Sequence, residues 1–183
     1  MNNAKNIKES LKKPIVLIGM MGSGKSRLGH ALAHALEVEF YDSDAIVEER
    51  AGRSIPDIFE EFGEAKFRQA EQNTILELLD TGLCVIGTGG GAITSPETLA
   101  AIKAQGVSVW LQADMTTILS RVLENENRPL LQHDDPEKVL NDLMEKRVPL
   151  YEQADIQFDT SAGNPQMLVR QLIKTLCEHL GLG

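Results

Sequence analysis

Residues 19–26, with the sequence GMMGSGKS, have the residue types and the spacing of a phosphate-binding loop. They match the pattern G-x-x-x-x-G-K-S, they follow the apolar run 15–18, and they precede a stretch whose apolar period predicts a helix. Glycines let backbone N–H groups turn toward phosphate oxygens, and the start of a helix adds partial positive charge. We therefore expect a strand, a loop and a helix that together hold the phosphates of a nucleotide.

The side chains of this loop suggest how ATP and a magnesium ion would be held. Lys25 would reach the β- and γ-phosphates and act as a catalytic cation, and the Ser26 hydroxyl would ligate Mg²⁺. The remaining expected ATP contacts are Gly22, Ser23, Gly24 and Arg27.

Two carboxylates, Asp42 and Asp44, follow the second expected strand, which ends near Tyr41. They should border the same cleft as the loop, because ligands bind at the carboxyl ends of parallel strands. One carboxylate could serve magnesium through water, and the other could hold a substrate hydroxyl. Alternatively, either could simply cap the helix expected from about residue 44, and capping is compatible with function.

Arginines near expected cleft elements suggest an acidic substrate. Arg68, Arg128 and Arg147 carry planar guanidinium groups that can donate two parallel hydrogen bonds to a carboxylate or a phosphate, although a lone arginine more often lies on a solvated face. Arg121 is a weaker fourth candidate. The glycine run 89–91 would let a ligand approach the backbone closely, but an ordinary loop would also use such glycines.

The chain alternates short apolar runs with helical patterns, and it shows no internal repeat. Strands are expected at 15–18, up to 41, and at 83–86, 107–111 and 156–158. Helices are expected at 25–36, from about 44, from a cap at 54 to 63, from there to 79, from about 95, and from 164. This order predicts an α/β chain with the three-layer α/β/α P-loop NTPase fold, built on a five-stranded parallel sheet.

We expect a single kinase domain over residues 1–183, with an ordered core at 14–183 and a mobile lid at about 124–135, where a polar, proline-containing segment interrupts the pattern. The net charge of −9 argues against binding to nucleic acid or to an anionic membrane surface. The first fourteen residues lack the apolar region of a secretory signal, so a cytoplasmic location is expected. The protein is also expected to be a monomer. Cys84 and Cys177 are expected to be reduced packing residues.

Taken together, these pieces resemble the shikimate kinases, a family of small nucleoside-monophosphate-kinase-like enzymes. The matching segments are GMMGSGKS, YDSD, SIPDIFEEFGEAKFRQAE, TGGGAI, ENRPLL and MEKRVPLY, in that order, and the likeness runs from about residue 14 to the C-terminal helix. Arg27 departs from the pattern, because the family usually has a small hydroxyl residue there. The segment 159–165 also lacks the basic residue that many relatives place before Asn-Pro.

The resemblance implies transfer of the γ-phosphoryl group of ATP to the 3-hydroxyl of shikimate, which gives 3-phosphoshikimate and ADP and serves aromatic amino acid biosynthesis. It implies that Arg68 and Arg147 grip the carboxylate of shikimate and that Asp44 holds the ring hydroxyls. Glu71 would orient Arg68. The shikimate-binding residues that it implies are Asp44, Arg68, Gly90, Gly91 and Arg147.

The resemblance also assigns roles around ATP. Arg128 in the lid would close over ATP and act in catalysis by steadying the charge of the transferred phosphoryl group. Asp42 would support Mg²⁺ through water near Ser26. Asp44 would orient the attacking hydroxyl and could accept its proton, which makes it the third expected catalytic residue beside Lys25 and Arg128.

Two other functions remain open at this stage. A gluconate kinase, or another kinase of small sugar acids, would share the loop, the sheet and the arginines near a carboxylate. The aspartate pair, followed by FR-x-x-E and TGGG, favours shikimate. A catalytically silent nucleotide-binding module would need only the phosphate loop, so the presence of Asp44, Arg68 and Arg147 argues against it.

Overall fold

A five-stranded, entirely parallel sheet forms the centre of the computed structural model, which describes residues 3–123 and 135–182. The strand order is β2-β3-β1-β4-β5. In register, Val16 of the central strand pairs with Ile86 on one side and Ser108 on the other. The expected α/β fold with a five-stranded parallel sheet is confirmed. The strands are β1 (Ile15–Ile18), β2 (Phe40–Asp42), β3 (Val85–Gly87), β4 (Val107–Gln112) and β5 (Ile156–Asp159).

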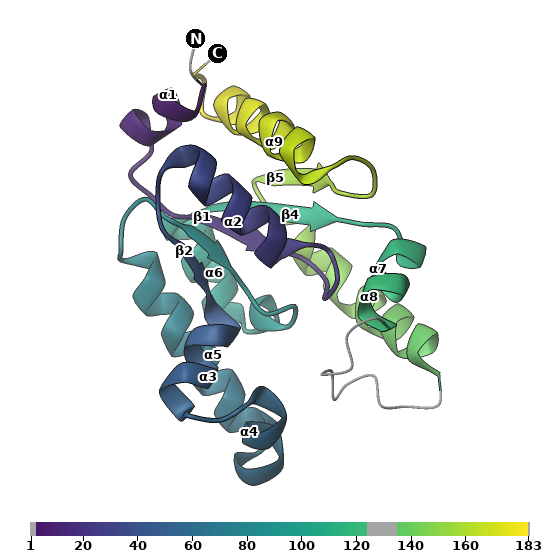
Figure 1. Cartoon of the computed structure of the whole chain (residues 1–183). Coiled ribbons are helices and arrows are strands. Elements are labelled where there is room, and N and C mark those ends of the chain that lie inside the picture. The colour runs from purple at the N-terminus through teal and green to yellow at the C-terminus, as the bar shows by residue number, and fades with distance from the viewer. Residues whose placement is uncertain (1–2, 124–134, 183) are drawn as a thin grey trace.

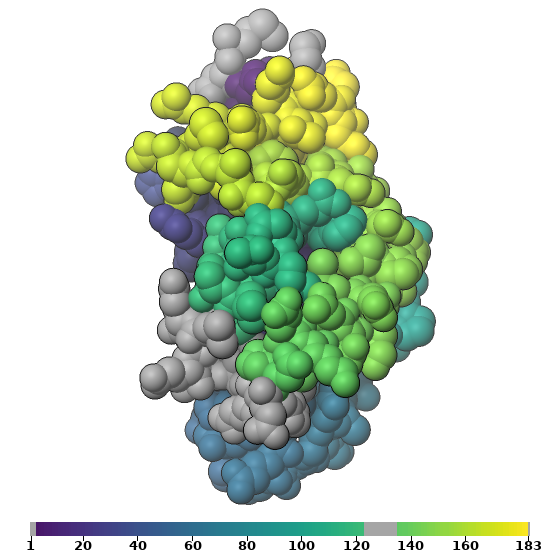
Figure 2. Space-filling view, turned by 90° about the vertical axis from the view of Figure 1, so that its right-hand side faces the viewer, coloured from purple at the N-terminus to yellow at the C-terminus, as the bar shows by residue number. Residues whose placement is uncertain are grey.

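Helices cover both faces of the sheet (Figure 1). One face is covered by α1 (Asn3–Ser10), α2 (Lys25–Leu36) and α9 (Pro165–His179). The other is covered by α5 (Glu64–Leu79), α6 (Pro96–Gln105), α7 (Met115–Leu123) and α8 (Pro136–Tyr151). The short helices α3 (Ser43–Ala51) and α4 (Ile55–Phe62) pack on α5 beyond the sheet, and the 3-10 turn Ala92–Thr94 follows β3. Figure 2 shows the α3–α4 projection, in blue, at the opposite end of the molecule from the yellow C-terminal helix.

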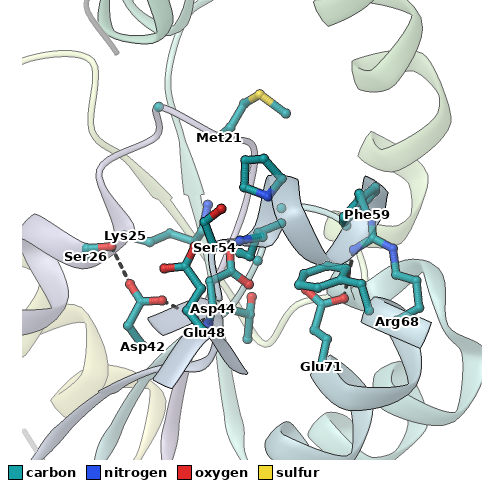
Figure 3. A pocket seen from close by; sticks show the side chains of 18 of the residues that line it. Met21, Lys25, Ser26, Asp42, Asp44, Glu48, Ser54, Phe59, Arg68 and Glu71 are labelled. Atoms are coloured by element: carbon teal, nitrogen blue, oxygen red, sulfur yellow. Dashed lines mark hydrogen bonds and ion pairs between the residues drawn. The ribbon is translucent and has the colours of Figure 1, made fainter. Parts of the chain in front are cut away.

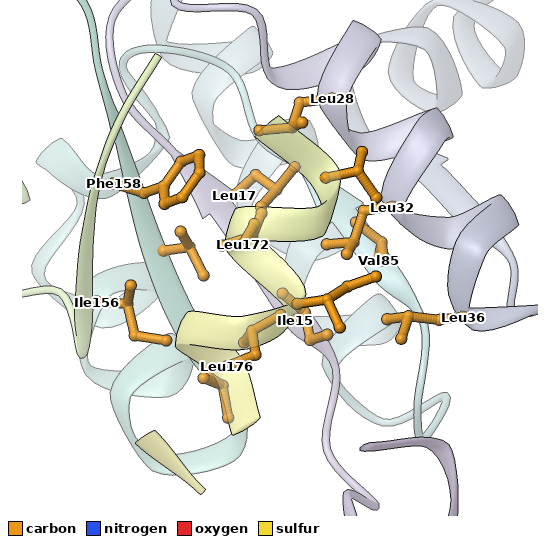
Figure 4. Close-up of a cluster of buried hydrophobic side chains, with 14 of the residues drawn as sticks. Ile15, Leu17, Leu28, Leu32, Leu36, Val85, Ile156, Phe158, Leu172 and Leu176 are labelled. Carbon is orange, nitrogen blue, oxygen red and sulfur yellow. The ribbon is translucent and has the colours of Figure 1, made fainter. Parts of the chain in front are cut away.

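The central strand β1 shows why the sheet must be covered on both sides. All four of its residues are buried, and successive side chains of a strand point to opposite faces. Leu17 packs into the cluster with Leu28, Leu32 and Leu172 from α2 and α9 (Figure 4). Val16 belongs to the second cluster, on the face covered by α5 and α6. An unbroken apolar strand therefore predicts two helical layers, and the structure has both.

Helix starts follow the capping residues of the sequence. Ser54 forms a capping box at the start of α4, and the side chains of Ser95 and Asn164 cap α6 and α9. Asp42 caps α3, so β2 runs one residue further than Tyr41, and the helix begins at once after it. The expected helices at 25–36, to 79, from 95 and from 164 are confirmed.

The N-terminal helix α1 was not predicted, because residues 1–14 carry few apolar side chains. Ile7 of this helix is fully buried against α2 and α9, and Cys177 of α9 donates a hydrogen bond to the Asn3 carbonyl at 3.4 Å. The buried core therefore includes α1, which precedes the expected start of the ordered core at residue 14. Tertiary contact stabilises a helix that is too short to be stable alone.

Most of the expected lid at 124–135 lies outside the described residues, as does Arg128. The last residue of that segment, Asp135, caps α8 by accepting a hydrogen bond from the Lys138 N–H at 3.0 Å. The single-domain assignment stays a prediction.

Cys84 and Cys177 are free and buried, as expected of packing residues. Within the described ranges, none of the helices combines the length and the apolar character that crossing a bilayer requires.

The contact of α1 with the core can be tested by truncating Ile7. We expect Ile7→Ala to lower the free energy of unfolding by about 2 kcal/mol, because it removes buried methyl groups and leaves a cavity. Glu9→Ala, on the exposed side of the same helix, should change it by less than about 0.5 kcal/mol. Urea unfolding followed by circular dichroism measures both. Equal stability of the two variants would show that α1 does not dock on the core.

Candidate active site

A cavity of about 550 Å³ opens at the carboxyl ends of β1, β2 and β3 (Figure 3). Its walls are the loop after each of these strands, together with α4, α5 and α8. This is the position in which parallel α/β sheets bind ligands, because their loops converge there. Among the expected site residues, the cavity is lined by Gly22, Gly24, Lys25, Ser26, Arg27, Asp42, Asp44, Arg68, Gly90, Gly91 and Arg147.

The phosphate loop turns through glycines with positive φ. Gly22 has φ 78° and Gly24, which caps α2, has φ 92°, a backbone region that L side chains rarely adopt. The Lys25 ammonium donates hydrogen bonds to the carbonyl oxygens of Gly19 and Met20, each at 2.8 Å. The cation is thereby anchored within the loop that the sequence assigns to phosphates.

Ser26 and Asp42 meet beside this loop. The Ser26 hydroxyl donates to Asp42 Oδ2 at 2.8 Å, and Asp42 Oδ1 accepts from the backbone N–H groups of Asp44 and Ala45 at the start of α3. The capping alternative for Asp42 is therefore confirmed, and it leaves the other oxygen facing Ser26. A hydroxyl and a carboxylate in contact are hard oxygen donors of the kind that Mg²⁺ takes, so the pair fits this ion.

Asp44 lies deeper in the cavity and has an unusual carboxyl group. Burial raises its pKa to about 7, and the nearby carboxylates of Glu71 and Asp42 act in the same direction, while Lys25 and Arg68 oppose the rise. Its Oδ1 is buried and accepts no hydrogen bond within the part of the chain that the structure describes. Such a carboxyl changes protonation near neutral pH, so it can either accept or release a proton there.

The glycine run 89–91 is packed against charged side chains from three helices. A Cβ atom added to Gly89 would collide with Glu71 Oε1 and would lie 2.7 Å from Asp44 Oδ1. One added to Gly91 would lie 2.8 Å from both terminal nitrogens of Arg68, and one at Gly90 would lie 3.5 Å from Arg147 Nη1. The loop-only explanation is thus insufficient for Gly89 and Gly91, because a side chain at either position would require the neighbouring charged groups to shift.

Arg68 is oriented by two glutamates of α5. Its Nη1 donates to Glu71 Oε2 at 2.8 Å, while Nε and Nη2 share Glu64 Oε1 at 3.2 Å. The arginine side chain keeps 28% of its surface exposed toward the cavity. Glu71 is only 2% exposed, yet it lines the cavity beside Arg68. Burial raises the pKa of Glu71, although Arg68 opposes this, so the arginine is what keeps the charged form tolerable.

Arg147 enters the same cavity from α8, far along the chain. It is 6% exposed, and its Nη1 lies 3.9 Å from Met20 Sδ in the loop after β1. The guanidinium groups of Arg68 and Arg147 therefore line one cavity together with the Asp44 carboxyl group. The arrangement suits a ligand that is both anionic and hydroxylated.

A second cavity of about 170 Å³ adjoins the start of α2, and three of its lining residues, Thr160, Gly163 and Pro165, belong to the segment 159–165 that departs from the family pattern. Ser23 lines this cavity rather than the main one, and Arg27 lines both. Arg121 also lines both, and its Nη1 donates to the Gly22 carbonyl at 3.0 Å, so the weaker arginine candidate contacts the phosphate loop directly. The other walls come from Gly24, Leu28, Thr160, Gly163, Pro165 and Leu168.

Known proteins match this chain over most of its length. The family model described as shikimate kinase matches residues 21–177. A shikimate kinase of Paramagnetospirillum magneticum is 44% identical over 170 residues, which cover 93% of this chain and 87% of that protein. A shikimate kinase of Mesorhizobium japonicum is 39% identical over 170 residues and is covered over 84% of its length.

Solved structures agree with these sequence matches. The structure of shikimate kinase from Acinetobacter baumannii in complex with shikimate superposes with a TM-score of 0.90 at 37% identity, covering 96% of this chain and 97% of that one. A gluconokinase from Sinorhizobium meliloti has a TM-score of 0.61 at 22% identity, and a likeness at that level extends to the fold alone. The family match and the relatives near 40% identity, together with the cavity that holds the expected residues, show that this chain belongs to the shikimate kinase family.

Proposed function

We propose that this protein transfers the γ-phosphoryl group of ATP to the 3-hydroxyl of shikimate and releases ADP and 3-phosphoshikimate. The observation that carries the proposal is the main cavity, in which Asp44, Arg68 and Arg147 surround the glycine run 89–91 directly beside the phosphate loop. An acid with several ring hydroxyls matches two guanidinium groups facing a carboxyl group. The family membership supports the same acceptor.

In this proposal, the acceptor is held from several sides. Arg68 and Arg147 bind its carboxylate, and the N–H groups of Gly90 and Gly91 offer further donors. Asp44 holds the ring hydroxyls. Glu71 acts through Arg68, since its hydrogen bond at 2.8 Å fixes one end of the guanidinium group.

The nucleotide lies across the phosphate loop in this proposal. Lys25 reaches the β- and γ-phosphates, and the backbone of 22–26 surrounds them, with Arg27 nearby. When bound at Ser26 and Asp42, Mg²⁺ would neutralise charge on the phosphate oxygens. The second cavity is suited to the adenine base, because it adjoins the loop and combines the Arg121 guanidinium with apolar walls.

During the reaction, the bond from the γ-phosphorus to the bridging oxygen of ADP breaks, and a bond from that phosphorus to the acceptor oxygen forms. Asp44 orients the attacking hydroxyl and takes its proton. Arg128, which lies outside the described residues, steadies the charge of the transferred group as the lid closes and excludes water. We further propose a cytoplasmic monomer that binds neither nucleic acid nor membranes.

The decisive experiment is a substrate panel with purified protein, ATP and Mg²⁺, in which ADP release is coupled to a spectrophotometric readout. Shikimate-dependent release of ADP is the expected result. Release with gluconate but not with shikimate would favour a sugar-acid kinase instead. If ATP binds and no acceptor is phosphorylated, a silent nucleotide-binding module is the better description.

Asp44 should give the reaction a pH dependence. Below its pKa of about 7 the carboxyl is protonated and cannot accept a proton, so kcat/KM for shikimate should rise as pH increases through about 7 and level off above it. Asp44→Asn should lower kcat by about 100-fold or more while sparing ATP binding. The remaining rate should no longer rise with pH around 7. Initial rates from pH 5.5 to 8.5 test both statements. Near-normal turnover by the variant would refute the role of Asp44.

The planar fork of Arg68 should matter more than its charge. Arg68→Lys keeps a cation beside Glu71 but loses the parallel donors, so we expect KM for shikimate to rise about 10-fold while KM for ATP changes little. Arg50→Lys is a matched control, because Arg50 pairs with Glu77 on the surface, outside both cavities. Steady-state kinetics measures both variants, and an unchanged KM for shikimate in Arg68→Lys would contradict the assignment.

The proposed metal role of Asp42 can be separated from its capping role. Asn also caps helices, so Asp42→Asn should fold normally but need about 10-fold more Mg²⁺ for half-maximal activity, because a charged oxygen is lost. Asp114→Asn is the control, since Asp114 accepts from the Thr117 N–H at the start of α7 and lines neither cavity. A Mg²⁺ titration at fixed ATP measures both variants. An equal Mg²⁺ requirement for Asp42→Asn and Asp114→Asn would contradict the proposed metal role of Asp42.

A further inference from the structure

Tyr151, the last residue of α8, connects the acceptor side of the main cavity with the phosphate loop. Its side chain is 1% exposed, and its hydroxyl donates a hydrogen bond to the Gly90 carbonyl at 2.5 Å. The same hydroxyl lies 3.8 Å from Met20 Sδ, in the loop after β1. The ring stacks on Trp110 of β4, with centroids 5.7 Å apart and an interplanar angle of 24°. Tyr151 does not line the cavity itself.

Met20 is a shared contact of the two functional residues on α8. Arg147, one helical turn before Tyr151, places its Nη1 3.9 Å from the Met20 sulfur. The Met20 carbonyl in turn accepts a hydrogen bond from the Lys25 ammonium at 2.8 Å. One buried methionine therefore touches the arginine of the acceptor site and the tyrosine below it, and its own backbone holds the cation of the phosphate loop.

The hydrogen bond to Gly90 has a directional consequence. The Gly90 carbonyl and the Gly91 N–H belong to one planar peptide unit, and the structure has no cis peptide bond among its described residues. In a trans unit the C=O and the N–H point in opposite directions. Holding the Gly90 oxygen against Tyr151 therefore aims the Gly91 N–H away from Tyr151.

That N–H remains available to a ligand. Neither Gly90 nor Gly91 donates a backbone hydrogen bond to another described residue. Gly91 also borders Arg68, because a Cβ atom added there would lie 2.8 Å from its terminal nitrogens. A donor fixed in direction beside a guanidinium group is the arrangement that a carboxylate or hydroxyl ligand requires.

We propose that Tyr151 is a positioning residue for the acceptor: its hydroxyl holds the Gly90 carbonyl, and thereby aims the Gly91 N–H beside Arg68 into the acceptor site. The inference rests on the proposed function, since it names the acceptor as the ligand. Burial raises the pKa of Tyr151 to about 12, so the hydroxyl stays protonated, as a donor must, throughout the range in which the enzyme would be assayed.

The test compares Tyr151→Phe, which keeps the ring on Trp110 and removes the hydroxyl, with Tyr41→Phe. Tyr41 is the chain's other tyrosine, and its hydroxyl has no hydrogen bond to any described residue. Calorimetric titration with shikimate in the absence of nucleotide should show a dissociation constant about 3- to 10-fold higher for Tyr151→Phe, as the loss of one hydrogen bond predicts. KM for shikimate should rise equally, while kcat and KM for ATP stay within about twofold.

A purely structural role predicts a different result. Tyr151→Phe would then melt at a lower temperature but bind shikimate as Tyr41→Phe does, and that outcome would overturn the proposal. Equal rises in KM for ATP and for shikimate would also overturn it. Trp110 is the only tryptophan in the chain, so its fluorescence maximum checks that the ring at 151 stays in place.

Two further measurements keep the test decisive. If the Phe variant does not fold, 4-aminophenylalanine at position 151 supplies an N–H donor in place of the hydroxyl. Shikimate affinity within about twofold of the unmodified protein is then expected, and a tenfold loss would overturn the proposal. Failure of the unmodified protein to bind shikimate would refute the proposed function, whereas normal binding by both proteins refutes only the role of Tyr151.

Discussion

The close approach of charged side chains to the backbone of residues 89–91 is the constraint on which the rest of the site depends. Two carboxyl groups, those of Asp44 and Glu71, meet at Gly89, and the Arg68 guanidinium lies against Gly91. The Gly89 N–H donates to the buried Ser43 hydroxyl at 3.3 Å, which ties this turn to the start of α3. A side chain at Gly89 or Gly91 would require these charged groups to shift from their positions around the cavity.

The charges in this cavity also limit one another. Burial disfavours the charged forms of Asp44 and Glu71, and their mutual repulsion adds to the effect on Asp44. Arg68 stabilises the charged form of Glu71 by a direct hydrogen bond and that of Asp44 by electrostatic attraction. The consequence is a division of roles between two neighbouring acids, because Glu71 accepts a hydrogen bond from Arg68, whereas Asp44 has a pKa of about 7.

The parallel sheet explains how residues so distant in sequence meet. The loops after β1, β2 and β3 emerge at one edge, so the phosphate loop, the Asp42–Asp44 pair and the glycine run become neighbours without further adjustment. α8 then adds Arg147 and Tyr151 one helical turn apart, and both reach Met20. The phosphate-loop side and the acceptor side of the cavity are thus connected by the buried Met20 side chain as well as by the cavity itself.

Many features of the fold and of the site can be predicted from the sequence, because each depends on residues that are close together in the chain. The unbroken apolar strand 15–18, the G-x-x-x-x-G-K-S loop and the caps Ser54, Ser95 and Asn164 each act within a few residues. The order of the motifs from GMMGSGKS to MEKRVPLY indicated the shikimate kinase family. Asp44, Arg68 and Arg147 could be proposed from the same motifs, since their residue types suit an acidic, hydroxylated acceptor.

Only the tertiary structure decided the features that depend on contacts between distant segments. The helix α1 is stable because Ile7 is buried against α2 and α9, and Glu71 is almost fully buried although it lines the cavity. The second cavity needs Arg121 and Thr160 to meet beside Ser23. The link from Tyr151 to Gly90 joins residues 61 positions apart, and no local periodicity records such a contact, because it arises only when the sheet and its helices have packed.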